Sequence, residues 1–170
     1  SPAEAAAVLE WSSGAAPRAR DAHPVEAIGE KAASFPDATA IVAGQQSLSY
    51  GTLERLATGL AQRMRGLGIQ PEDRVALVLE RTLWMPVLLL ATLKAGGCYV
   101  PIDPRLPQQR IRAVVEESGA RLVVTTTPIE SLPEAVLVST LCSTCVEAPA
   151  AVAGPVRELL DDALVYVIYT

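Results

Sequence analysis

Apolar positions along this 170-residue chain recur with two different spacings, and the spacing changes at regular intervals. Spacings of three and four residues, typical of amphipathic helices, predict helices over four segments. Short apolar runs, typical of strands, lie between these segments. The predicted helices are 25–35, a helix that has Ser49 as its N-cap and ends near 66–68, 82–95 and 107–118. The predicted strands are 39–43, 47–50, 74–79, 97–101, 121–126 and 164–170. This alternation predicts an α/β fold with a mostly parallel sheet covered by helices.

The segment 93–104, which reads LKAGGCYVPIDP, changes from a helix pattern to a strand pattern at two glycines. Gly96 can take the left-handed conformation that closes a helix, and Gly97 has no Cβ to hinder close packing of the returning backbone. Pro101 and Pro104 cannot donate to a sheet ladder, so we expect the strand to end at or beside them. The segment predicts a stiff helix-to-strand corner, which is structural in itself.

Two stretches of the chain lack a sustained period. Residues 1–24 mix a short helical run with small residues and proline, a composition typical of a linker, and His23 lies in it. Residues 126–155 hold one strand-like run, AVLVS, and are otherwise rich in Pro, Ala, Ser and Thr, so we expect an irregular excursion there. Asp161 and Asp162 precede the last predicted strand and are typical of a solvated turn.

Composition narrows the classes of function. The net charge is −5 and the basic residues are scattered, so no patch for nucleic acid is expected. The longest apolar run, Met85–Leu93, is far shorter than the roughly 20 residues that span a bilayer, so we expect a cytoplasmic protein without membrane contact. Half of the residues are hydrophobic but only 4% are aromatic, which favours an aliphatic core between sheet and helices.

The cysteines and the single histidine give no sign of a metal or disulfide site. Three cysteines, Cys98, Cys142 and Cys145, make an odd number, which argues against a disulfide framework. Cys142 and Cys145 have redox-motif spacing, but they lie in a predicted loop rather than at the start of a helix. With His23 as the only histidine, no zinc set is expected.

The remaining charged candidates have structural interpretations. Lys94 lies at the end of a predicted buried helix. This position favours the interpretation that its charge complements the helix dipole over the interpretation that it contacts a phosphate. Asp103 is expected to cap or order the loop after Pro101. No acid–base pair is apparent, so no catalytic residue and no metal ligand is assigned.

The order of five segments closely resembles the start of a nonribosomal peptide synthetase adenylation domain, a member of the adenylate-forming superfamily. The resemblance covers roughly Pro24–Thr170, with Leu67–Thr125 as its most specific part. It departs from the family at Cys98, where alanine is usual, and at Thr52, where an acidic residue is common. The segments are LSYGTLERLATGLAQRM, PEDRVALVLER, LKAGGCYVPIDP, RIRAVVEESGARLVVTT and LVYVIYT.

The resemblance implies a fold and an activity. The fold is the N-terminal portion of the large subdomain of the adenylate-forming fold. The activity uses ATP with Mg²⁺ to convert an amino acid to aminoacyl-AMP and pyrophosphate, and then passes the acyl group to the phosphopantetheine thiol of a carrier protein. Thr170 matches the first residue of the family's phosphate loop, and it is the one cofactor-binding residue that the resemblance carries over. In the family, the amino-acid pocket and the catalytic lysine come after the phosphate loop, so the resemblance carries none of their residues over to this sequence.

The resemblance also implies a domain arrangement. Residues 1–24 resemble the tail of a condensation domain and an inter-domain linker, and 25–170 resemble an adenylation domain truncated at the start of its phosphate loop. The implied partners are the upstream condensation domain, the downstream carrier protein and the rest of the adenylation domain, and the chain alone is expected to be inactive. Three alternatives stay open: a free-standing enzyme with a flexible N-terminus, an acyl- or aryl-acid-activating ligase of the same superfamily, and a non-catalytic docking scaffold within a synthetase.

Overall fold

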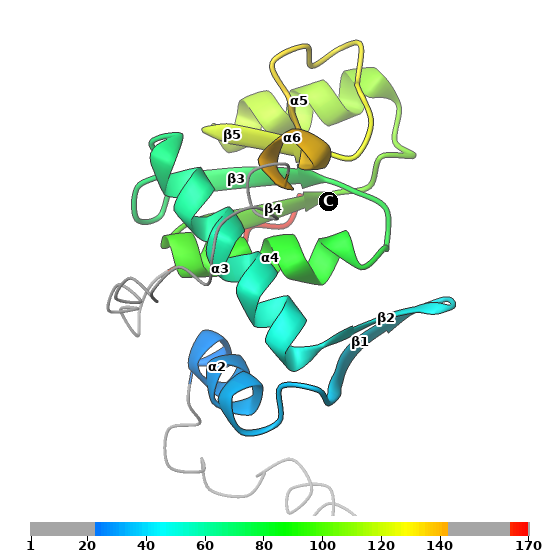
Figure 1. The fold of residues 1–170 in the computed structure, drawn as a ribbon. Helices are drawn as coiled ribbons and strands as arrows, with labels where there is room; N and C mark the ends of the chain where they lie inside the picture. The colour runs from blue at the N-terminus through cyan, green and yellow to red at the C-terminus, as the bar shows by residue number, and fades with distance from the viewer. Residues whose placement is uncertain (1–22, 143–163, 170) are drawn as a thin grey trace, which may run out of the picture.

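A four-stranded parallel sheet forms the centre of the computed structural model, which describes residues 23–142 and 164–169 (Figure 1). The strand order is β4-β3-β5-β6, and all three neighbouring pairs are parallel. This confirms the predicted α/β fold with a mostly parallel sheet. The strands are β3 (Arg74–Val78), β4 (Cys98–Ile102), β5 (Leu122–Thr125) and β6 (Val136–Leu137).

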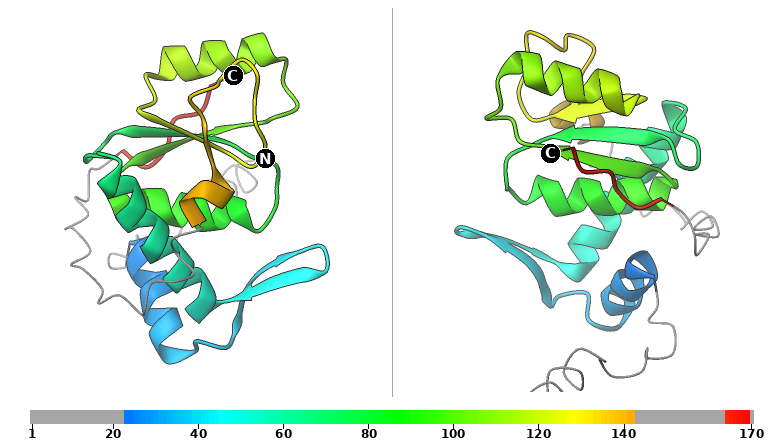
Figure 2. Two further views of the ribbon diagram at one scale, coloured as in Figure 1. Left: turned by 45° about the horizontal axis from the view of Figure 1, so that its top comes forward. Right: turned by 180° about the vertical axis from the view of Figure 1, so that it is seen from behind.

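Helices cover both faces of this sheet (Figure 2). They are α3 (Tyr50–Gly66) and α4 (Trp84–Ala95) on one face and α5 (Gln108–Ser118) on the other. The connections β3–α4–β4 and β4–α5–β5 cross the sheet in opposite directions, so right-handed crossovers place α4 and α5 on opposite faces. β3 is buried on both sides: Val75 and Leu77 belong to the core beneath α3 and α4, whereas Ala76 and Val78 belong to the core beneath α5.

Helix α2 (Pro24–Ser34) and a hairpin lie before α3 along the chain (Figure 1). The hairpin strands, β1 (Thr39–Ala43) and β2 (Gln46–Ser49), pair antiparallel. Ser49 is the N-cap of α3, as predicted, and accepts a hydrogen bond from the Thr52 amide at 3.3 Å. His23, the last residue before α2, is its N-cap, and its Nδ1 accepts a hydrogen bond from the Val25 amide at 3.3 Å.

The two glycines form the predicted corner between α4 and β4. Gly96 closes α4 with a left-handed φ of 89°. A Cβ on Gly97 would lie 3.0 Å from the Asp73 carbonyl oxygen and 3.3 Å from Cγ2 of Thr92, so only glycine fits without a shift of the backbone. This confirms the close packing that was predicted at the corner.

β4 continues through Pro101 and ends at Ile102, one residue further than the proline. The amide and carbonyl of Tyr99 bond to Val165 and Val167, away from β3. Since backbone groups alternate in direction along a strand, Pro101 also faces away from β3, and its missing N–H removes no bond from the β3–β4 ladder.

The last described segment, 164–169, lies beside β4 and runs parallel to it through a bridge between Tyr99 and Tyr166, whose rings stack with centroids 5.8 Å apart. Exposure alternates as in a strand: every second side chain from Val165 is half-buried, and the others are exposed. The pairing is a single bridge and not the full strand that was expected. Leu164, Tyr166 and Ile168 are the exposed apolar members of the segment.

The run AVLVS was expected to be strand-like throughout, but its last residues are helical. Val136 and Leu137 pair with β5 as β6, and the chain then turns into the short helix α6 (Val138–Cys142). Val138 and Leu141 are buried against the core that α3 and α4 cover, which anchors the turn into the helix. The rest of the predicted irregular excursion after 142, together with Asp161 and Asp162, lies outside the described residues.

Candidate functional site

The carboxyl edge of the parallel sheet carries a cavity of about 470 Å³. In open α/β sheets, ligands bind at this edge, outside the carboxyl ends of the strands. β3 and β4 are hydrogen-bonded neighbours and end here together, so the residues that follow them meet at one place. The cavity is lined by Leu79, Glu80, Arg81, Met85, Pro101, Ile102, Asp103 and Arg105.

The floor of the cavity is apolar and is held by hydrogen bonds of the turn before α4. Leu79 and Ile102 are buried where β3 and β4 end. Met85 lies in the first turn of α4, and its amide donates to the Thr82 carbonyl oxygen at 3.2 Å. The Thr82 hydroxyl accepts from the Trp84 amide, so the turn between β3 and α4 is held by its own hydrogen bonds.

The rim of the cavity is charged and contains one engaged pair. Asp103 accepts hydrogen bonds from the Arg105 amide and from its Nε, each at 2.9 Å. The bonds to Arg105 lower the pKa of Asp103 to about 2, and the charges of Arg105 and Arg81 act in the same direction. The interpretation that Asp103 orders the loop after Pro101 is thus confirmed.

Arg81 is the cation of the rim that has no such partner. It is exposed and makes no hydrogen bond or ion pair with any residue that the structure describes, although it lies close enough to influence Asp103. Glu80 is also exposed and raises the pKa of Arg105 together with Asp103. The site therefore combines an engaged pair with an arginine whose donors are available.

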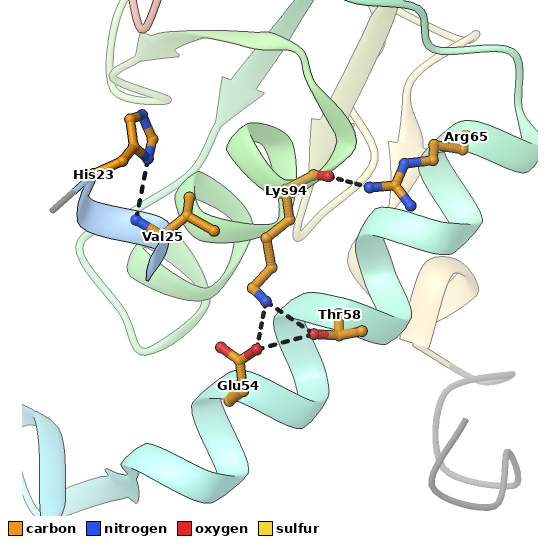
Figure 3. A network of polar contacts seen from close by, with 6 residues as sticks. All are labelled: His23, Val25, Glu54, Thr58, Arg65 and Lys94. Atoms are coloured by element: carbon orange, nitrogen blue, oxygen red, sulfur yellow. Dashed lines mark hydrogen bonds and ion pairs between the residues drawn. The ribbon is translucent and has the colours of Figure 1, made fainter. Parts of the chain in front are cut away.

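Lys94 does not line this cavity. It lies at the end of α4, and Figure 3 shows its contacts with α3. Its side chain is 6% exposed and pairs with Glu54 on α3, and Nζ also donates to the Thr58 hydroxyl at 3.1 Å. Arg65 donates to the Lys94 carbonyl oxygen, so α3 holds both the side chain and the backbone at the end of α4. The interpretation of Lys94 as structural agrees with this position, but its partner Glu54 was not anticipated.

The other candidates from the sequence lie away from the cavity or outside the described residues. Thr170 and Cys145 are outside them, although the segment that ends at Tyr169 runs parallel to β4 and so points toward the same edge. Burial raises the pKa of the Cys98 thiol and of the Cys142 thiol, which favours unreactive thiols. In the described ranges, 23–142 and 164–169, no three His, Cys, Asp or Glu residues are grouped so that they could hold a metal ion.

Sequence reasoning missed the members of the rim that make this edge a site. Glu80, Arg81 and Arg105 were not singled out. A usable signal was present, since each follows a predicted strand by a few residues and would reach the carboxyl edge of a parallel sheet.

The fold agrees with the comparisons to known proteins. The model of the family described as AMP-binding enzyme matches residues 28–170. The chain belongs to the AMP-binding enzyme family.

The curated relatives that the chain matches are much longer peptide synthetases. The chain is 37% identical over 167 residues to a linear gramicidin synthase of Brevibacillus parabrevis, covering 96% of this chain and 3% of that protein. It is 40% identical over 102 residues to bacitracin synthase 2 of Bacillus licheniformis, covering 60% of this chain and 4% of that protein. The chain thus spans a small part of the curated relatives it matches.

Two solved structures share the fold of this chain. The nonribosomal peptide synthetase FmoA3, in its α-methyl-L-serine-AMP-bound form, is similar with a TM-score of 0.72 and 29% identity over 86% of this chain and 17% of that one. The N-terminal domain of FACL13 from Mycobacterium tuberculosis shares the fold, with a TM-score of 0.75 and 22% identity over 86% of this chain and 41% of that one. The fold is therefore that of the N-terminal domain of adenylate-forming enzymes, as expected.

Helices of the described part are all too short or too polar to cross a membrane.

Proposed function

We propose that this chain is the N-terminal part of an adenylation domain that activates an amino acid in a nonribosomal peptide synthetase. The complete domain would join ATP and the amino acid to give aminoacyl-AMP and pyrophosphate, and would then pass the acyl group to the thiol of a carrier protein's phosphopantetheine. The similarity to a peptide synthetase over 96% of the chain carries the proposal. The likeness to the N-terminal domain of FACL13, at 22% identity, supports the fold alone.

ATP and Mg²⁺ would supply the phosphoryl chemistry, and the described residues contribute support rather than phosphate ligands. Thr170, the proposed first residue of the phosphate loop, follows a segment that is aligned with β4 and points to the carboxyl edge. The Lys94–Glu54 pair fixes the end of α4, and the glycine corner fixes the start of β4. Both lie at the start of β4, and by fixing that strand they would support the loop at its far end, since sites on rigid elements keep their geometry.

The residues before the described part belong to a separate proposal. We propose that 1–24 connect an upstream condensation domain to the adenylation domain. Limited proteolysis of the longer protein should cleave within 1–22 before it cleaves within the sheet, because linkers between domains are accessible to proteases. Equal resistance of 1–22 and the sheet would argue against a linker.

The function is tested by pyrophosphate exchange with ATP in the complete protein that carries this chain. Exchange should depend on an amino acid and not on fatty or aryl acids, and the 170-residue chain alone should give none. Exchange stimulated by a fatty or an aryl acid instead would identify an acyl- or aryl-acid ligase. A complete protein that shows no pyrophosphate exchange with any of these acids, but binds a condensation or carrier domain, would be a docking scaffold.

A further inference from the structure

The segment 164–169 joins the central sheet at one residue of β4. The Tyr99 amide donates to the Val165 carbonyl oxygen at 3.1 Å, and the Tyr99 carbonyl oxygen accepts from the Val167 amide at 3.1 Å. These two bonds form the bridge in which Tyr99 lies opposite Tyr166. Figure 2 shows the segment in red beside the sheet. Within the described residues, the backbone of the segment is therefore attached to the sheet at Tyr99.

The two faces of this segment are supported in different ways. Val167 and Tyr169 pack against the core beneath α5, so one face is held by contacts with that core. On the other face, the Tyr166 ring stacks on the Tyr99 ring, with centroids 5.8 Å apart and an angle of 17° between the planes. Ile168 shares this second face and is 62% exposed. In the described part of the chain, the second face thus rests on the Tyr99 ring.

Tyr99 is itself fixed in the sheet. It lies in register with Val75 of β3, and its ring packs against the core beneath α3 and α4. Its neighbours along β4, Cys98 and Val100, are fully buried. Tyr166, by contrast, is 51% exposed, and the distance between the two rings lies in the range that stacked aromatic pairs prefer. The stack therefore fixes an exposed side chain of the segment relative to a strand of the core.

We propose that Tyr99 is a positioning residue for the phosphate loop. Its ring and its two backbone bonds would hold the segment 164–169 so that the residues after it reach the carboxyl edge in the arrangement that binds ATP. The inference rests on the proposed function, in which Thr170 begins that loop. Thr170 is four positions after Tyr166, so a displacement of the stacked ring would displace the start of the loop with it.

Loss of the stack should change the affinity for ATP and not the rate at saturation. Without the Tyr99 ring, the loop would be in the binding arrangement for a smaller fraction of the time, and the apparent affinity falls in proportion to that fraction. An aromatic pair changes an equilibrium constant by about two- to ten-fold. Saturating ATP would restore the binding arrangement, so kcat should be retained.

Pyrophosphate exchange by the complete protein that carries this chain tests the inference. Tyr99→Leu should raise the KM for ATP by about two- to ten-fold, with kcat and the KM for the amino acid unchanged. Tyr99→Phe keeps the ring and should behave as the parent protein does. Tyr50→Leu is the matched control, because Tyr50 is also partly buried but begins α3, and it should leave the KM for ATP unchanged. A merely structural role of Tyr99 would instead lower the amount of active enzyme, and thus the apparent kcat, at an unchanged KM.

A second measurement follows the segment directly and needs no turnover. In the complete protein, Tyr99→Leu should speed hydrogen–deuterium exchange in peptides that cover 164–169 and leave peptides that cover β5 unchanged. Tyr166→Leu should raise the KM for ATP as Tyr99→Leu does. The double variant should add little to either, because the two rings act as one pair.

Four results would overturn the inference. They are an unchanged KM for ATP in Tyr99→Leu, an equal increase in Tyr99→Phe, unchanged hydrogen exchange over 164–169, and fully additive effects of the two leucine variants. A parent protein that shows no pyrophosphate exchange with any acid would contradict the proposed function instead. Isothermal titration with ATP would then make the same comparison of parent and Tyr99→Leu, and a parent that binds no ATP would overturn both.

Discussion

The two edges of the central sheet use their arginines in opposite ways. At the amino edge, Arg74 donates to the Ser118 carbonyl oxygen at 2.6 Å, and Arg121 donates to the Gly68 carbonyl oxygen at 3.1 Å. At the carboxyl edge, Arg81 makes no hydrogen bond to the described part of the chain and borders a cavity. The amino edge is therefore closed by bonds within the domain, and the carboxyl edge keeps donors available for another molecule.

The closed edge also includes the turn before β3. The Glu72 amide donates to the Gly96 carbonyl oxygen at 2.8 Å, and the Cys98 amide donates to the Asp73 carbonyl oxygen at 2.9 Å. Glu72 itself has a φ of 64°, in the left-handed region that disfavours residues with a Cβ. The comparison shows a division of roles between the edges. The strained and closely packed residues lie at the amino edge, where they contribute to stability, and the accessible charge lies at the carboxyl edge, where a ligand can bind.

Replacing Lys94 should give the largest effect on stability. Lys94→Met leaves the Glu54 carboxylate partly buried without its cation, and its Oε2 already has no hydrogen-bond partner in the described part of the chain. We expect a loss of about 3 kcal/mol in the free energy of unfolding, measured by urea denaturation. The double variant with Glu54→Leu should recover most of this loss, and no recovery would show that the pair is not the cause.

Adding a methyl group at the glycine corner should cost less. Gly97→Ala forces a shift against the Asp73 carbonyl oxygen, and we expect a loss of about 2 kcal/mol in the same measurement. Gly29→Ala is the control, because nothing lies within 4 Å of its added Cβ in α2, and it should be neutral or stabilising. A Gly97→Ala chain as stable as the parent would contradict the tight corner.

Relieving the strained turn should stabilise the chain. Glu72→Gly removes the Cβ from a left-handed residue, and we expect a gain of about 1 kcal/mol in the free energy of unfolding. Glu72→Ala keeps the Cβ and separates the effect of conformation from that of the lost carboxylate. A gain of equal size in both variants would assign the effect to the charge.

The smallest effect on stability should come from the charged rim, where solvent screens the Asp103–Arg105 pair. The pKa of Asp103 is lowered from 3.8 to about 2, so the pair stabilises the fold above about pH 4, and this contribution is lost as the pH falls toward 2. Carboxyl ¹³C NMR should give a titration midpoint of about 2 for Asp103. In Arg105→Gln the midpoint should move back toward 3.8, and an unchanged midpoint would mean that Arg105 is not the partner.

Local patterns were sufficient to predict much of the fold. The helix spacing, the Ser49 cap and the Gly96 corner depend on neighbouring residues, and the structure confirms them. The division of AVLVS between β6 and α6 was not predictable, because a short apolar run fits a strand or a buried helix, and packing decides between them.

The contacts that assemble the sites depend on distant residues. Lys94 and Glu54 are 40 positions apart, and no pattern within either helix marks them as partners. Arg81 meets Asp103 and Arg105 only because β3 and β4 end at the same edge. Thr170, the one cofactor-binding residue that the family resemblance implied, lies outside the described residues and stays a prediction.

Pro101 limits how the segment that ends at Tyr169 can attach to the sheet. The Val167 amide bonds to the Tyr99 carbonyl oxygen, and the next bond of a regular ladder would run from residue 101 to the Val167 carbonyl. Proline has no hydrogen to donate there. The pairing between the two segments therefore lacks one hydrogen bond at that point. The backbone that follows Val167 has one constraint fewer just where it approaches the carboxyl edge.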